Sequence, residues 1–122
     1  MSEDISKLPP QIQQRLLRLQ QLQQSLQSVL TQKQQLDMQL TEVEQASSEL
    51  EKLDETAVIY KSIGALLIKS EKDKVTTELT ERKELLTMRV DVLAKQEERL
   101  RTQVKDLQDK LQQDLRPVSG SV

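Results

Sequence analysis

Apolar residues recur at alternating spacings of three and four in two long stretches of this 122-residue chain. From Ile12 to Leu50, nine of the twelve positions in this pattern are apolar, and from Thr76 to Asp114 eight of twelve are apolar. A repeat sustained over six heptads is typical of a coiled coil rather than of an isolated surface helix. We therefore predict two long helices that pack through their apolar stripes.

Both helices carry recognisable start or stop signals. Leu8-Pro9-Pro10 favours a helix start, because proline is tolerated only in the first turn. Polar cap residues precede the second helix, and Pro117 ends it. The predicted organisation is one domain over 1–122, with a first helix over 8–54, a hairpin over 57–69, a second helix over 72–116, and flexible tails over 1–7 and 117–122.

The stretch between the helices is the only one that predicts β structure. Two runs rich in apolar and β-branched residues, Ala57–Lys61 and Ala65–Lys69, flank Ser62-Ile63-Gly64. A three-residue loop with glycine last suits a type I turn followed by a left-handed residue. We predict a β-hairpin here, which would reverse the chain and set the two helices antiparallel.

The two apolar stripes complement each other if Ile63 is the midpoint of the reversal. Each residue of the first helix then faces the one equally far from Ile63 in the second, so that five layers are fully apolar and seven are mixed. Arg15 faces Leu111, and Asp114 faces Ile12. Mixed layers disfavour slipped registers. This fit favours an intramolecular antiparallel coiled coil over an extended dimer.

An isolated two-stranded hairpin is marginal in water, and both its edges offer unpaired backbone groups. We therefore expect hairpins of several subunits to join in a closed assembly. The alternative is a loop folded against its own helices. The residues expected to mediate subunit assembly are Val58, Ile59, Tyr60, Gly64, Leu66, Leu67 and Ile68.

Composition excludes several functions. Tyr60 is the only aromatic residue, and the 18 basic and 20 acidic residues are interspersed, which argues against a nucleic-acid partner. The chain has no histidine or cysteine and only two glycines, so we expect no metal, no cofactor and no enzymatic activity. No apolar run is long enough for a membrane span, and we expect a cytoplasmic protein.

The segment Val58–Lys69 resembles the hairpin of prefoldin beta subunits, with the pattern Tyr-Lys, two residues, Gly, two residues, Leu-Ile-Lys. The Leu-Pro-Pro helix start, the glutamine-rich first helix and Gln-Glu-Glu at 96–98 are also similar to that family. The resemblance covers residues 8 to 118. One hairpin between the helices, rather than two, points to the beta type.

The resemblance implies a fold and a function. The fold would be mostly α, with an antiparallel two-helix coiled coil, one β-hairpin between the helices, and hairpins joining subunits in a β-barrel body. The complex would be a hetero-hexamer of two alpha-type and four beta-type prefoldin subunits. Its tips would bind non-native client proteins without ATP and deliver them to a group II chaperonin.

The residues give a separate reason to examine the helix ends far from the hairpin. Apolar residues there exceed what the stripes need, because Leu16, Leu17 and Leu115 lie outside them. Exposed apolar patches often mark interaction sites. The residues expected to bind clients at the tips are Leu8, Ile12, Leu16, Leu17, Leu19, Leu107, Leu111, Leu115 and Val118.

Three other interpretations compete with these expectations. Leu16 and Leu17 could simply widen the stripe or contact a neighbouring helix. The chain could be a structural coiled-coil scaffold without client binding, although a scaffold needs no hairpin. It could also be a helical arm detached from an enzyme. In the first helix, eleven of the 25 residues from Gln11 to Gln35 are glutamine, which fits either a solvated face or a low-charge surface for varied clients.

Overall fold

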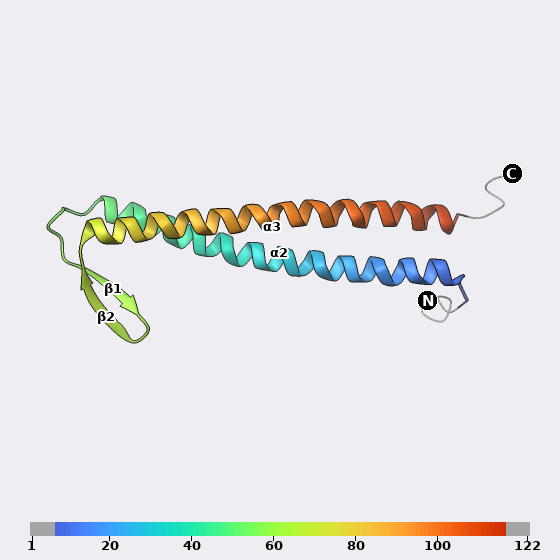
Figure 1. The fold of residues 1–122 in the computed structure, drawn as a ribbon, viewed down its shortest axis with the longest axis horizontal. Coiled ribbons are helices and arrows are strands. Elements are labelled where there is room, and N and C mark those ends of the chain that lie inside the picture. Colours follow the sequence, from blue (N-terminus) through green and yellow to red (C-terminus); the bar gives the residue numbers. More distant parts are fainter. Residues whose placement is uncertain (1–6, 117–122) are drawn as a thin grey trace. The chain divides into compact units, whose positions relative to one another are not determined.

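The structure, a computed structural model, describes residues 7–116. In chain order it contains helix α2 (Pro10–Glu51), strand β1 (Ile59–Ile63), strand β2 (Leu66–Ser70) and helix α3 (Lys72–Asp114) (Figure 1). The predicted mostly-α fold with one hairpin between two long helices is therefore confirmed. Of the predicted tails over 1–7 and 117–122, only Lys7 belongs to the described residues, where it lies in a turn.

The start of α2 follows from its two prolines. The backbone N–H groups of Ile12 and Gln13 both donate to the carbonyl of Pro9, at 3.0 and 3.1 Å. Pro10 is the first helical residue, where its missing N–H would have found no helical partner in any case. Gln13 Nε2 also donates to the carbonyl of Leu8 at 2.7 Å, which holds the chain against the first turn.

Both helices end slightly earlier than the sequence suggested. α2 ends at Glu51 rather than 54, because Lys52 and Leu53 make tighter bonds to the carbonyls three residues before them. Asp54 then accepts the Thr56 N–H on its side chain at 3.2 Å, an arrangement that favours a turn. At the other end of the chain, α3 ends at Asp114 rather than 116.

The hairpin turn differs from the prediction. Ile63 pairs with Leu66, so the turn holds only Gly64 and Ala65. The prediction of a three-residue loop at Ser62-Ile63-Gly64 is therefore wrong. Gly64 has a φ of 57°, and no non-glycine residue in the described chain has positive φ. Glycine at the first central position alone is the pattern of a type II′ turn, whose twist matches that of the strands. Glycine is thus needed at the start of the turn, not at the end of a longer loop.

The shorter turn moves both strands along the chain. β1 and β2 begin later than the predicted runs 57–61 and 65–69, and their register pairs Ile59 with Ser70. The connections to the helices are also unequal, since residues 52–58 precede β1 whereas Glu71 alone separates β2 from α3. Ile63 is therefore not a symmetric midpoint, and the hairpin does not by itself set the register of the helices.

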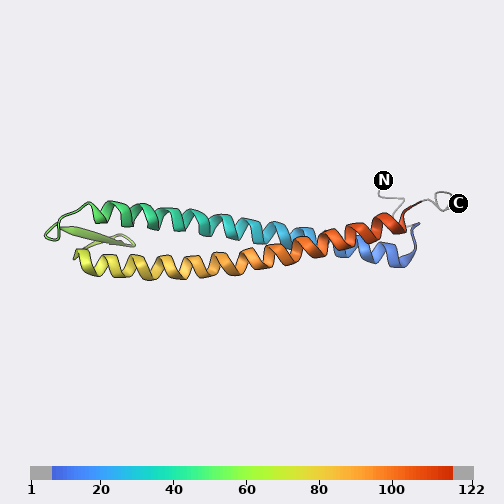
Figure 2. The same ribbon diagram turned by 90° about the horizontal axis from the view of Figure 1, so that it is seen from above.

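The chain forms two compact units. Unit 1 contains the described residues 7–32 and 93–116, and unit 2 contains residues 33–92 with the hairpin. Each unit includes one segment of α2 and one of α3, running in opposite directions (Figures 1 and 2). The expectation of a single domain over the whole chain remains a prediction.

The buried side chains lie on the predicted apolar stripes. In α2 they recur every seven residues. Seven residues make about two helical turns, so the same heptad position faces the neighbouring helix segment each time. Unit 1 buries Leu22, Val29, Leu93 and Leu111, and unit 2 buries Leu36, Val43, Leu50 and Leu86. All eight are aliphatic, and no polar or charged residue among the described ones is fully buried.

The hairpin occupies one side of unit 2. Figures 1 and 2 show that it projects beside the helix segments of this unit instead of prolonging either helix. It is a two-stranded antiparallel sheet, and an ion pair connects it to α3, with 2.6 Å between Lys61 Nζ and Glu78 Oε2. The hairpin is thus attached to α3 through the middle of β1, while most of its apolar side chains stay exposed.

Candidate interaction surfaces

The hairpin presents apolar side chains on both of its faces. Cross-strand partners point to the same face of an antiparallel pair. The first face carries Ile59, Lys61, Ile63, Leu66, Ile68 and Ser70, and the second carries Tyr60, Ser62, Leu67 and Lys69. Sheets that face water usually alternate between apolar and polar faces. A hairpin that is apolar on both faces is suited to being covered on both.

Exposure confirms that this chain does not itself cover the hairpin. Leu67 is 72% exposed and Leu66 is 65% exposed, while Ile63, Tyr60 and Ile68 are also exposed. The first face is the better protected of the two, since Ile59 and Ser70 are half-buried. Each strand has one neighbour in the sheet, so one edge of each strand is free to pair. The interpretation of the hairpin as a loop folded against its own helices does not fit this exposure.

Val58 and Gly64 have separate places in this region. Val58 is exposed and lies just before β1, so it extends the apolar surface without joining the ladder. A Cβ built on Gly64 would meet nothing within 4 Å, so only the backbone conformation demands glycine there. Gly64 therefore shapes the hairpin rather than making a close contact.

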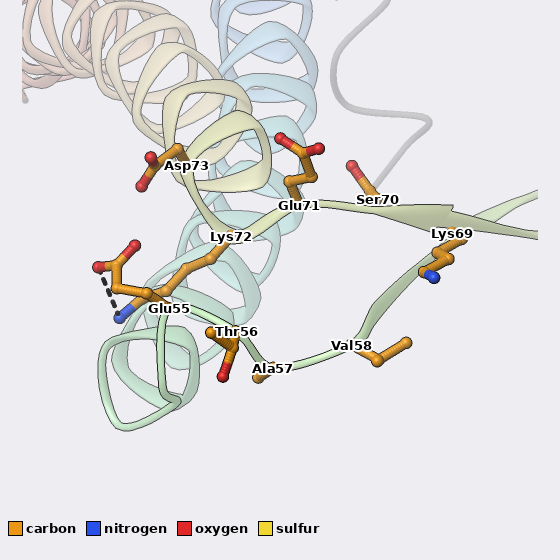
Figure 3. A pocket seen from close by; sticks show the side chains of 9 residues that line it. All are labelled: Glu55, Thr56, Ala57, Val58, Lys69, Ser70, Glu71, Lys72 and Asp73. Atoms are coloured by element: carbon orange, nitrogen blue, oxygen red, sulfur yellow. Dashed lines mark ion pairs between the residues drawn. The ribbon is translucent and has the colours of Figure 1, made fainter.

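The base of the hairpin forms a shallow hollow of about 300 Å³ where the 52–58 connection meets the start of α3 (Figure 3). Lys72 holds it together, because its Nζ donates to the carbonyl of Leu53 at 2.7 Å and lies 3.7 Å from Glu55 Oε1. Glu71 and Asp73 lie at the same place, so the hollow carries mixed charge (Figure 3). This arrangement fixes the hairpin to the helices and provides no concentrated charge for a ligand.

Sequence reasoning missed the role of Lys72. A lysine at the start of a helix ordinarily reads as a solvated residue, and only the fold brings Leu53 and Glu55 to it. The side chain of Lys72 is only 16% exposed. Because its partners lie 19 and 17 positions earlier in the chain, no local pattern could have revealed them.

Most predicted tip residues lie in unit 1 and are partly or largely exposed. Leu17 is 60% exposed and Leu115 is 51% exposed. The half-buried members are Leu8, Ile12, Leu16, Leu19 and Leu107. Leu111 differs, because it is only 5% exposed and packs inside unit 1. Val118 lies outside the described residues.

The start of α2 and the end of α3 are joined by a contact that the sequence did not suggest. The guanidinium of Arg15 pairs with the carboxylate of Asp114. The predicted layers set these residues in separate rows, facing Leu111 and Ile12. Neighbouring rows of a coiled coil are close enough for a long arginine side chain to span them. The two polar exceptions at this end of unit 1 therefore satisfy each other.

The described residues show no arrangement typical of a metal site or of a membrane span. No group of three or more histidine, cysteine, aspartate or glutamate side chains between residues 7 and 116 is placed to hold a metal ion. Over the same part of the chain, neither helix contains a stretch long and apolar enough to cross a bilayer. The surfaces that remain as candidates are the hairpin and the exposed leucines of unit 1.

Two long helices joined by one exposed hairpin define a class of helical hairpin proteins, and comparisons with known proteins identify the family. A family model described as "Prefoldin subunit" matches residues 13–117. The prefoldin subunit beta of Methanosarcina acetivorans is 44% identical over 112 residues, covering 92% of this chain and 96% of that protein. That of Archaeoglobus fulgidus is 45% identical over 116 residues, covering 95% and 100%.

Solved structures agree. The crystal structure of the prefoldin beta subunit from Thermococcus strain KS-1 is similar to this chain with a TM-score of 0.84 and 43% identity, covering 89% of this chain and 96% of that one. The beta2 subunit of the same strain shares the fold, with a TM-score of 0.68 and 23% identity. The chain belongs to the prefoldin beta subunit family, whose members are chaperone subunits.

Proposed function

We propose that the chain is a beta-type subunit of a hetero-hexameric, ATP-independent holdase. In this complex, two alpha-type and four beta-type subunits join through their hairpins in a β-barrel body. The helix ends of unit 1 bind non-native proteins and deliver them to a group II chaperonin. The observation that carries the proposal is the hairpin, which is apolar on both faces and largely exposed.

The hairpin supports assembly because leaving it uncovered is unfavourable. Five described apolar residues on it are between 44% and 72% exposed, and each strand has a free edge. Burying such side chains contributes roughly 1.5–3 kcal/mol each. Hairpins of neighbouring subunits would supply both the missing apolar cover and the missing backbone partners.

The leucines of unit 1 support client binding. Leu17 and Leu115 are exposed and lie outside the apolar stripe, so helix pairing does not account for them. Aliphatic side chains on an open surface favour promiscuous over selective binding. Leu111 does not belong to this surface, because it is covered within unit 1.

The client-binding claim has a matched control. Leu17 and Met38 occupy the same heptad position of α2 and are 60% and 61% exposed, but Leu17 is in unit 1 and Met38 is in unit 2. We expect Leu17→Ser combined with Leu115→Ser to weaken suppression of aggregation of a denatured protein, without nucleotide, in a complex with an alpha-type subunit. Met38→Ser should leave suppression unchanged. Equal suppression by all variants would favour a structural scaffold without client binding.

Assembly is tested separately by native mass measurement, with and without an alpha-type subunit. We expect a defined hetero-oligomer in the mixture, and we expect Leu67→Lys to reduce it because this leucine is the most exposed apolar residue of the hairpin. A wild-type chain that stays monomeric in the presence of its partner would refute assembly through the hairpin.

A further inference from the structure

The two units carry opposite net charge. Among the described residues, unit 1 has nine basic and five acidic side chains, a net charge of +4. Unit 2 has nine basic and thirteen acidic side chains, a net charge of −4. The α2 segment of unit 1 contributes Lys7, Arg15 and Arg18 and no acidic residue over 7–32. The unit that bears the tip leucines therefore attracts anionic groups, although the whole chain is acidic.

A groove runs between the two helix segments of unit 1. It consists of two adjoining hollows of about 230 and 340 Å³ that share Gln103 as a lining residue. Four apolar residues of the helix stripes line its floor, namely the buried Leu22 and Val29 and the half-buried Leu100 and Leu107. The charged residues of its rim are Arg18, Arg99, Asp106 and Lys110. We call this feature the unit 1 groove.

The rim of the unit 1 groove is basic on both helices. Arg18 comes from α2 and Lys110 from α3, and both line the first hollow, while Arg99 lines the second. Asp106 is the only acidic lining residue of either hollow. All four charged side chains belong to exposed residues, so they can reorient toward a bound partner. The charged lining of the groove thus consists of three basic side chains and one acidic side chain.

We propose that the unit 1 groove binds an extended segment of an unfolded polypeptide that combines apolar with acidic side chains. The leucine and valine floor provides apolar contact, and the rim pairs with carboxylates. The shallow hollows suit an extended chain rather than a folded ligand or a compact small molecule. This inference rests on the proposed client binding and specifies which client segments are preferred.

The groove is distinct from the exposed tip leucines. In the heptad pattern, its polar rim residues Arg18, Gln103 and Lys110 share the position just before the first apolar residue of each repeat. Leu16 and Leu115 directly follow the second stripe position of their repeats, which Arg15 and Asp114 occupy. Residues at that place lie on the opposite side of a helix pair. A client segment in the groove would therefore contact a different side of unit 1.

An acidic polypeptide fits the groove better than a nucleic acid. Single-stranded nucleic acids are bound through aromatic stacking as well as charge, and Tyr60 in the hairpin is the only aromatic residue of the chain. The apolar floor offers nothing specific to a phosphate backbone, whereas it can contact the apolar side chains of a polypeptide. The polypeptide is consequently the occupant that we test.

The test uses the assembled complex and three labelled peptides with one apolar sequence, flanked by glutamate, glutamine or lysine. We expect the glutamate peptide to bind about three- to ten-fold more tightly than the lysine peptide at low salt, with the difference largely lost near 0.5 M salt. Arg18→Glu combined with Lys110→Glu should abolish or reverse the preference. As a control, Lys74→Glu combined with Lys52→Glu makes the same charge change in unit 2. This control variant should keep the preference for the glutamate peptide.

The position of the peptide can be trapped directly, because the chain contains no cysteine. A single Gln103→Cys substitution lies in the groove, and Gln108→Cys lies outside its lining on the same helix. A glutamate peptide whose cysteine is activated as a mixed disulfide with thiopyridine should exchange faster with the first variant, forming the protein–peptide disulfide and releasing thiopyridone. Equal trapping at both positions would overturn the groove as the site.

The outcomes separate this inference from the proposed function. Equal affinity for all three peptides would overturn the charge preference and leave client binding intact. Failure of every peptide and of a denatured protein to bind would refute client binding itself, and the groove with it. A single-stranded DNA oligonucleotide that binds as tightly as the glutamate peptide would also overturn the inference, because it would show a general polyanion surface.

Discussion

The guanidinium of Arg15 pairs with the carboxylate of Asp114, and this ion pair joins the second turn of α2 to the last residue of α3 within unit 1. The two side chains are 27% and 26% exposed. Both occupy heptad positions that an apolar residue would ordinarily fill. The pair therefore links two neighbouring rows of the helix packing that each lack one apolar residue, beside the buried Leu111.

This ion pair should contribute measurable stability. In a double-mutant cycle of Arg15→Gln and Asp114→Asn, we expect a coupling energy of roughly 0.5–1 kcal/mol at low salt. The coupling should shrink in 1 M salt, because both charges remain partly accessible to ions. Urea unfolding at one fixed protein concentration measures it. Additive effects of the two substitutions at low salt would contradict the role of the pair.

Reversing the pair should preserve or improve stability. Asp114 is the last residue of α3, where the carbonyl end of the helix disfavours a negative charge, so only the pairing compensates for it. Arg15→Asp combined with Asp114→Arg keeps the attraction and places a favourable charge at that helix end. We expect the double variant to match or exceed the wild type by a few tenths of a kcal/mol. A double variant that is less stable than both single variants would contradict this argument.

Neighbouring leucines on α3 should respond very differently to truncation. Leu86 is 2% exposed and sits in the core of unit 2, whereas Leu85 is 54% exposed. Leu86→Ala should lower the free energy of unfolding by about 2–5 kcal/mol, because it removes buried apolar contacts and leaves a cavity. Leu85→Ala should change it by less than about 0.5 kcal/mol. Similar losses for the two variants in urea unfolding would contradict the assigned packing.

The heptad pattern was sufficient to predict the helices and the buried stripe. The buried residues of α2 are spaced by seven, as in Leu22, Val29 and Leu36. This spacing is visible in the sequence of one helix and requires no knowledge of its partner. The hairpin was also predictable, because β-branched runs around a glycine differ clearly from both helices. The apolar excess of unit 1 could likewise be read from Leu17 and Leu115, which fall outside the stripe.

The hairpin turn and the contacts between residues far apart in the sequence were not predictable in the same way. A glycine between two strands is compatible with several loop lengths, and the choice at Gly64 depends on its φ and on cross-strand pairing. The partners of Lys72 and Arg15 are distant in sequence and meet only after folding. Leu111 falls on the predicted apolar stripe, but it was also expected at the exposed tip, and the opposite helix segment of unit 1 covers it.

Gly64 should be sensitive to substitution for a conformational rather than a steric reason. Its φ of 57° is unfavourable for residues with a Cβ, although a Cβ there would meet nothing within 4 Å. Gly64→Val should destabilise the hairpin by about 1–2 kcal/mol and reduce assembly with an alpha-type subunit. Ala65→Ser, at the neighbouring turn position with negative φ, should have little effect. Native mass measurement would contradict the argument if Gly64→Val assembled as well as Ala65→Ser.

Lys72 should hold the connection between α2 and β1 in place. Its Nζ donates to the Leu53 carbonyl at 2.7 Å, so Lys72→Met leaves that carbonyl without this partner while keeping the aliphatic stem. A lost hydrogen bond to a charged group corresponds to about 1.5–3 kcal/mol when buried, and less at this partly exposed site. We therefore expect local opening of the connection without loss of either helix.

Hydrogen exchange can detect this local opening. The Ala57 N–H donates to the Asp54 carbonyl at 3.0 Å and lies in the connection that Lys72 holds. In the Lys72→Met variant, we expect this amide to exchange about three- to ten-fold faster, whereas amides near Leu86 keep their protection. Lys74→Met serves as the control, because this exposed lysine lies on the same helix turn. Equal exchange at Ala57 in the two variants would show that Lys72 does not restrain the connection, and the fixed position of the hairpin base would then need another cause.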